Sequence, residues 1–113
     1  MTKEERENAH IMRKIWKCIA EDYETQKGDP LLFPAKASDD LISKMPPTII
    51  WEYEFDIYIT EATRMAHRMR RAGRLLEFRV QPGLIHAAFD IPGTKAQEES
   101  FKDYARAIKE YLL

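Results

Sequence analysis

Two residues of this sequence have the side chains and the placement for acid–base chemistry, Asp56 and His86. Asp56 directly follows the apolar and aromatic segment 48–55, and His86 comes shortly after a second such segment, 75–80. A carboxylate that holds an imidazole in one tautomer forms the base half of a nucleophilic triad. The alternative interpretation is an exposed aspartate at a strand end and an unrelated loop histidine.

Two strands and the helix between them are predicted to position these side chains. Residues 48–55, TIIWEYEF, have the β-branched and aromatic content typical of a strand, and residues 75–80, LLEFRV, predict a second one. A helix is predicted to open at Thr60 and to end at Gly73. Connections this short favour a βαβ unit with two parallel strands. Since the carboxyl ends of parallel strands share one edge, we expect Asp56 and His86 within hydrogen-bonding reach.

Amphipathic helices are predicted at both ends of the chain. Apolar residues recur at three- and four-residue intervals over residues 3–23, with Trp16 in the middle of a core-facing stripe and Cys18 beside it as a small packing residue. Thr94 and Gln97 form a capping box that opens a C-terminal helix. A single α/β domain is expected over 1–113, with the N-terminal helix in 1–26, an irregular connection with a short helical turn after Ser38 in 27–47, and the βαβ unit and C-terminal helix in 48–113.

Composition excludes several classes of function. The 113 residues carry 18 Lys and Arg against 19 Asp and Glu, a net charge of -1, so no nucleic-acid partner is expected. No apolar run approaches the ~20 residues of a membrane span. A single cysteine and a charged N-terminal segment lead us to expect a cytoplasmic protein without disulfides. The scattered histidines predict neither a metal site nor a cofactor.

Three segments resemble the C-terminal third of the hormone-sensitive-lipase-like carboxylesterases, which have the α/β-hydrolase fold. In that family a Pro-Pro approach to a strand leads to a Glu-x-Asp turn with the triad aspartate, and MPPTIIWEYEFD places Glu54 and Asp56 there. The family's Pro-Gly-x-x-His-x-x-Phe loop is matched by PGLIHAAF, which puts His86 at the catalytic histidine. The resemblance covers roughly residues 28–112 and implies a partial α/β-hydrolase fold and an esterase or lipase ancestry.

The sequence also departs from that family. Only Glu61 matches the Pro-Leu-x-Asp-Glu that often follows the aspartate, and Ala87 replaces the glycine that usually follows the histidine. No serine of the chain lies in a Gly-x-Ser-x-Gly elbow, and no histidine precedes a glycine, as the family's oxyanion loop requires. Cys18 lies in a predicted helix and is a poor substitute nucleophile. The chain is therefore predicted to be the C-terminal part of an esterase, from a truncated or split gene, and inactive alone.

The missing neighbours of the sheet predict a partner. The edge at Thr48 to Tyr53 is long and apolar, and we expect a homodimer or a complementary hydrolase chain to pair with it. A small ester is then a substrate only when the chain is complemented. The alternative is a non-catalytic α/β module whose function is association. A weaker third possibility rests on basic residues of the middle helix, which form either a phosphate-binding or acidic-partner patch or a solvated face: Arg64, His67, Arg68, Arg70, Arg71 and Arg74.

Overall fold

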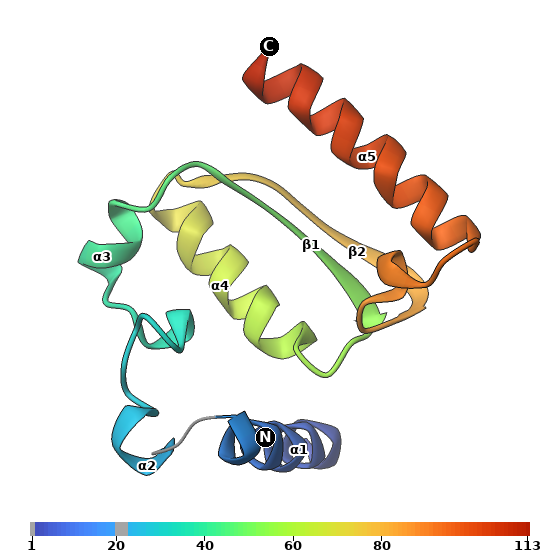
Figure 1. The fold of residues 1–113 in the computed structure, drawn as a ribbon. Helices are drawn as coiled ribbons and strands as arrows, with labels where there is room; N and C mark the ends of the chain where they lie inside the picture. The colour runs from blue at the N-terminus through green and yellow to red at the C-terminus, as the bar shows by residue number, and fades with distance from the viewer. Residues whose placement is uncertain (1, 20–22) are drawn as a thin grey trace.

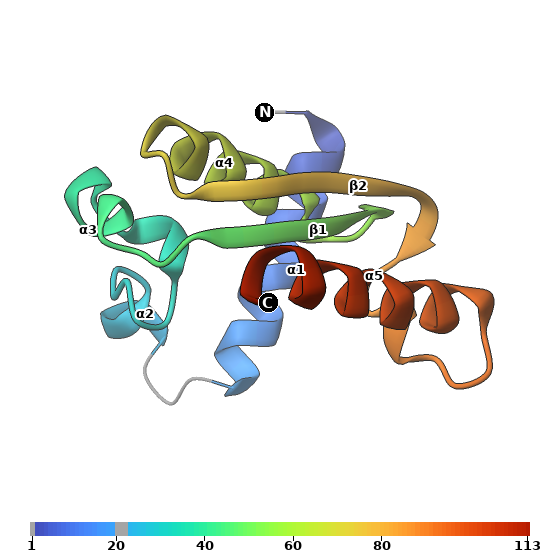
Figure 2. The same cartoon turned by 90° about the horizontal axis from the view of Figure 1, so that it is seen from above.

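The chain folds as a small α/β structure in which a pair of strands lies between two helices. The computed structural model describes residues 2–19 and 23–113. Figure 1 shows the strands β1 and β2 with α4 on one side and α5 on the other, and Figure 2 shows the same arrangement from above. The elements in chain order are α1 (Lys3–Ile19), α2 (Tyr23–Gln26), η1 (Pro34–Lys36), α3 (Asp39–Ser43), β1 (Thr48–Phe55), α4 (Ile59–Arg71), β2 (Leu75–Ile85), η2 (Ala88–Asp90) and α5 (Lys95–Leu112).

The two strands are parallel, as the βαβ pattern predicts, with a register that runs from Thr48 opposite Leu75 to Phe55 opposite Ile85. The α/β class is thereby confirmed. The predicted end of the second strand at residue 80 is wrong, because β2 continues to Ile85 through an irregularity that includes Pro82. There the Glu54 carboxylate accepts a hydrogen bond from the Gly83 N–H at 2.8 Å, and Gly83 has a φ of 75°. A bulge tolerates proline and glycine within a strand.

The hydrophobic core lies between α4, α3 and one face of the strands. Met69 of α4 and Ile42 of α3 are each only 1% exposed, and they pack with Ala37, Ile50 and several half-buried apolar residues. The α4 helix begins one residue earlier than predicted, at Ile59. It ends as predicted, with Gly73 in the left-handed conformation at a φ of 70°.

The connection 27–47 contains the short helix that was predicted after Ser38, α3, and also the 3-10 helix η1, which was not predicted. The Ser38 hydroxyl caps α3 by accepting a hydrogen bond from the Leu41 N–H at 3.2 Å. The guanidinium of Arg68 on α4 holds this segment in place, since it donates to the carbonyl oxygens of Ala35 and Ala37 and pairs with Asp39 at 2.8 Å. These long-range contacts are not readable from a local pattern of Gly and Pro.

The N-terminal helix α1 does not contribute to the buried core of the described residues. It was predicted to face the core up to residue 23; residues 20–22 of that prediction lie outside the described residues, and the stripe residues Ala9, Met12 and Ile15 are half-buried. Cys18, predicted to be a packing residue, is exposed. The side chain of Trp16 lies outside the described part of the structure. In Figure 1, α1 lies beyond α4, away from the strands, so the core is closed by α3 and α4 instead.

The opposite face of the strands is bridged by α5. The Thr94 hydroxyl caps this helix by accepting from the Gln97 N–H at 3.2 Å, as the predicted capping box requires. The ring of Tyr104 stacks on Trp51 of β1 with centroids 5.6 Å apart. A cavity of about 560 Å³ remains between α5 and the strand residues Ile49 and Leu76. Within the described residues, no helix is both long and apolar enough to cross a membrane.

Candidate active site

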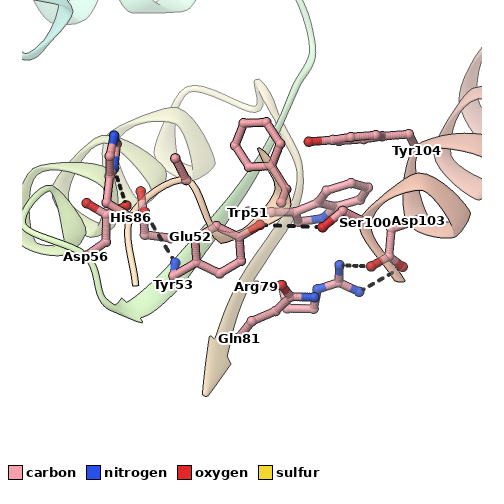
Figure 3. A pocket seen from close by; sticks show the side chains of 12 residues that line it. Trp51, Glu52, Tyr53, Asp56, Arg79, Gln81, His86, Ser100, Asp103 and Tyr104 are labelled. Atoms are coloured by element: carbon pink, nitrogen blue, oxygen red, sulfur yellow. Dashed lines mark hydrogen bonds and ion pairs between the residues drawn. The ribbon is translucent and has the colours of Figure 1, made fainter. Parts of the chain in front are cut away.

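Asp56 and His86 lie side by side at the carboxyl ends of the two strands. Asp56 follows β1 and His86 follows β2, and the last residues of those strands, Phe55 and Ile85, are register partners. The His86 Nδ1 atom is 2.7 Å from the Asp56 Oδ2 atom (Figure 3). The parallel pairing therefore brings together two side chains that are 30 residues apart in the sequence.

The Asp56 carboxylate is buried and fixed by its own turn. Only 4% of the residue is exposed. Its Oδ1 atom accepts a hydrogen bond from the Tyr58 N–H at 2.8 Å, while its main-chain N–H donates to the Tyr53 carbonyl at 3.1 Å. One carboxylate oxygen thus faces a backbone donor and the other faces the imidazole. Donors of this kind stabilise the ionised form of a buried carboxyl group.

The His86 imidazole is anchored on one side and open on the other. Its side chain is 58% exposed, and its ring lies 5.1 Å from the ring of Tyr58, tilted by 46°. When the neutral ring donates its Nδ1 proton to Asp56, Nε2 carries the free lone pair. This arrangement can accept a proton from a hydroxyl group that approaches Nε2, and Asp56 then stabilises the imidazolium that forms.

The backbone immediately after His86 takes a conformation that L side chains rarely adopt. Ala87 has φ 57° and ψ 26°, in the left-handed region, and it leads into η2 with the buried residue Ala88. This is the position at which the resembling family usually carries glycine. An alanine there is strained by about 1–2 kcal/mol relative to the right-handed conformation.

A cavity of about 220 Å³ adjoins the pair, and it brings in a residue that sequence reasoning missed. Glu52 of β1 lines it together with Asp56 and His86. Burial, with a hydrogen bond shared with Asp56 and the charge of that carboxylate, raises the pKa of Glu52 to about 7. The available signal was the presence of a carboxyl group in the buried first part of an aromatic strand, four residues before Asp56.

The other candidates from the sequence lie elsewhere or have structural partners. Cys18 is on α1, outside the residues that line this cavity. Ser100, which the sequence did not offer as a candidate, lines the cavity but lies within α5, with its Oγ 3.5 Å from the Tyr53 hydroxyl, and so is not on an elbow. Among the described residues no group of three or more His, Cys, Asp or Glu side chains is placed to hold a metal ion.

Several of the basic residues on and after α4 hold the fold together. Arg68 binds the 35–39 segment, Arg74 donates from Nε to the Ser43 carbonyl at 2.7 Å, and Arg64 pairs with Glu61 at 3.4 Å. The pairing of Arg68 and Arg74 with the segment before β1 gives these cations a structural role, which favours the solvated-face interpretation of the patch.

A strand-end carboxylate in contact with a histidine that follows the next parallel strand is an arrangement found in the hydrolases built on an open α/β sheet. A family model described as the alpha/beta hydrolase fold matches residues 2–90. The chain belongs to this alpha/beta hydrolase-fold family. No curated protein matches the sequence.

Proposed function

We propose that this chain supplies the acid–base half of a serine carboxylic-ester hydrolase. The observation that carries the proposal is the 2.7 Å contact between His86 Nδ1 and the buried, doubly engaged Asp56 carboxylate. Membership of the alpha/beta hydrolase-fold family supports it, because Asp and His follow the nucleophile in the chain order of that fold. The resemblance to the hormone-sensitive-lipase-like carboxylesterases supplies the ester substrate class.

In this proposal each residue has a distinct role. His86 Nε2 removes the proton from a serine hydroxyl as that oxygen attacks the ester carbonyl, and it then returns the proton to the departing alkoxide. Asp56 fixes the tautomer and stabilises the imidazolium. The serine and the oxyanion donors come from a complementary polypeptide, because the 113 residues contain no Gly-x-Ser-x-Gly elbow. Since triad members act together, the chain alone is proposed to be inactive.

A complementation assay tests the proposal. The purified chain is assayed with p-nitrophenyl butyrate alone and after co-expression with the elbow-bearing N-terminal part of a hormone-sensitive-lipase-like carboxylesterase. We expect background hydrolysis alone and hydrolysis above background in the pair. His86→Ala and Asp56→Asn should remove that gain, and the matched control His67→Ala, an exposed histidine on α4, should keep it. Hydrolysis that survives His86→Ala, or turnover by the chain alone, contradicts the proposal.

A second candidate function, association without catalysis, is favoured by the edge of the sheet. Among the described residues β1 pairs with β2 on one side, so its other edge, from Thr48 to Tyr53, carries unpaired backbone groups. Phe55 beside it is 62% exposed, and α5 exposes apolar side chains such as Ile108 and Leu112. We propose that a second copy or a complementary hydrolase chain pairs with this edge. Light scattering at tens of micromolar should show a dimer for the isolated chain, and a strict monomer that also fails complementation contradicts both modes of pairing.

A further inference from the structure

Glu52 is a second carboxyl group at the candidate active site, and the chemistry proposed above does not use it. It lies on β1, is half-buried, and lines the cavity of about 220 Å³ with Asp56 and His86. Figure 3 shows the Glu52 side chain beside that of Asp56. Two neighbouring carboxyl groups can hydrogen-bond to each other only when one of them keeps its proton, because two carboxylates offer only acceptors.

The hydrogen bonds around the two carboxyl groups place that proton on Glu52. Asp56 accepts from the Tyr58 N–H at 2.8 Å and faces His86 Nδ1 at 2.7 Å. Glu52 accepts only a longer hydrogen bond, from the Tyr53 N–H at 3.2 Å, among the contacts of the described residues. The negative charge is therefore better stabilised on Asp56. Burial and the neighbouring Asp56 raise the pKa of Glu52 to about 7, so its proton is lost near neutral pH.

The charged groups that face Glu52 come from three parts of the fold. Asp56 follows its own strand, His86 follows β2, and Arg79 of β2 lies across the same cavity. Arg79 is paired with Asp103 of α5 at 2.5 Å, so its charge is largely balanced. The hydroxyl groups of Tyr53 and Tyr104 complete the titratable lining. Asp56 and His86 thus dominate the electrostatic environment of Glu52.

We propose that Glu52 is a positioning residue of the Asp56–His86 pair. Its proton ties the Asp56 carboxylate in place, and its ionisation adds a negative charge that strengthens the hold of His86 on a proton. In this proposal the ionisation of Glu52 and the protonation of His86 depend on each other. This inference rests on the proposed function for its catalytic meaning, but its geometry and its test need no hydrolysis.

An NMR titration of the full chain tests the coupling. The imidazole resonances of His86 and the carboxyl carbon of Glu52 are followed from pH 4.5 to 9 in the unmodified chain, in Glu52→Gln and in Glu54→Gln. Glu54→Gln is the control. It replaces a carboxyl group on the same strand, but one that is exposed and accepts a hydrogen bond from the Gly83 N–H. We expect the Glu52 carbon to titrate near pH 7. Replacing Glu52 by Gln should lower the titration midpoint of His86 by about half a pH unit or more. It should also remove a second step from the His86 titration curve.

Two results overturn the inference. One is a Glu52 carboxyl carbon that titrates near its ordinary pKa of 4.5. The other is an equal displacement of the His86 midpoint in Glu52→Gln and Glu54→Gln. If Glu52→Gln fails to fold, the carboxyl resonance of the unmodified chain decides the matter alone. Failed complementation with an intact coupling counts against the hydrolase proposal only, whereas complementation without coupling counts against the role of Glu52 only.

Discussion

The two faces of the β1–β2 pair are covered in different ways. On one face α4 and α3 bury Met69 and Ile42 almost completely against the strands. On the other face α5 reaches the strands through long side chains, with Trp51 stacked on Tyr104 and Arg79 paired with Asp103. A cavity of about 560 Å³ stays open beside those contacts. The first face is closed by apolar packing, and the second is spanned by aromatic and polar bridges.

This difference indicates where the fold is self-sufficient. Apolar burial stabilises by roughly 25 cal/mol per Å² and is not directional, so the α4 face is held by packing among residues of this chain. Polar bridges across a half-open gap contribute less and depend on each partner. The α5 face therefore depends more on each individual contact than the α4 face does. The Asp56–His86 pair lies at the carboxyl ends of the two strands (Figure 3).

Met69→Ala should produce the largest loss of stability, because it removes a side chain that is only 1% exposed from the α4 face. The lost burial and the cavity left behind should lower the free energy of unfolding by about 2–5 kcal/mol. Urea denaturation followed by circular dichroism measures this. Met65→Ala, at a half-buried position of the same helix, is the matched control and should cost less. Equal losses would mean that the α4 face is not closed around Met69.

Asp103→Ala tests the polar bridge of the α5 face. It leaves the Arg79 guanidinium without its carboxylate, and the Nε of Arg79 is already buried without a hydrogen-bond partner. We expect a loss of about 1–2 kcal/mol in urea denaturation, smaller than for Met69→Ala because both partners are partly exposed. Glu98→Ala breaks an exposed pair with Lys102 on the same helix and should change stability far less. A larger loss for Glu98→Ala would contradict the bridging role of Arg79 and Asp103.

Sequence patterns predicted the α4 face better than the α5 face, for a physical reason. The βαβ unit, the cap at Gly73 and the buried stripe through Ala66 and Met69 follow from local periodicity and turn chemistry. The extension of β2 depends on a long-range hydrogen bond from Gly83 to Glu54, which no local pattern encodes. The predicted apolar stripe of α1 is half-buried at Ala9, Met12 and Ile15. Amphipathicity shows that a helix has an apolar side, but not which surface covers it.

The contact between Asp56 and His86 was predictable from the sequence, but the residues around it were not. Strand-end placement and parallel topology were sufficient to bring Asp56 and His86 together. Glu52 was missed because alternation along a strand shows which face a residue takes, whereas its contact with Asp56 depends on the turn after β1. Their assignment as triad residues remains a prediction, which the complementation assay addresses.

Glu52→Gln, in the cavity beside Asp56 and His86, should change how the stability of the protein depends on pH. The folded-state pKa of Glu52 is raised from 4.5 to about 7, chiefly by burial, so its contribution to stability is fully present below about pH 4.5 and is lost as the pH rises through about 7. Gln does not titrate. The free energy of unfolding of the variant, minus that of the unmodified chain, should therefore rise by about 1 kcal/mol from pH 4.5 to pH 8, after allowance for solvent screening. Urea denaturation at both pH values measures the difference, and Glu54→Gln should show no such gain.

Ala87→Gly should give the smallest effect, and the only gain in stability at a fixed pH. Ala87 holds a left-handed φ of 57° where the chain leaves His86 and crosses toward α5. Glycine adopts that conformation without steric strain but loses more backbone entropy on folding, so the net gain in urea denaturation should be about 0.5–1 kcal/mol.

Ala88→Gly is the matched control for that substitution, because Ala88 is the next residue along the chain, is buried in η2 and has no positive φ. It should lose stability, since it removes a buried methyl group and adds backbone entropy to the unfolded chain. A loss in both variants would mean that the turn after His86 is not strained. A gain confined to Ala87→Gly would show that the backbone is strained at the residue after His86, in the turn that leads from the strands toward α5.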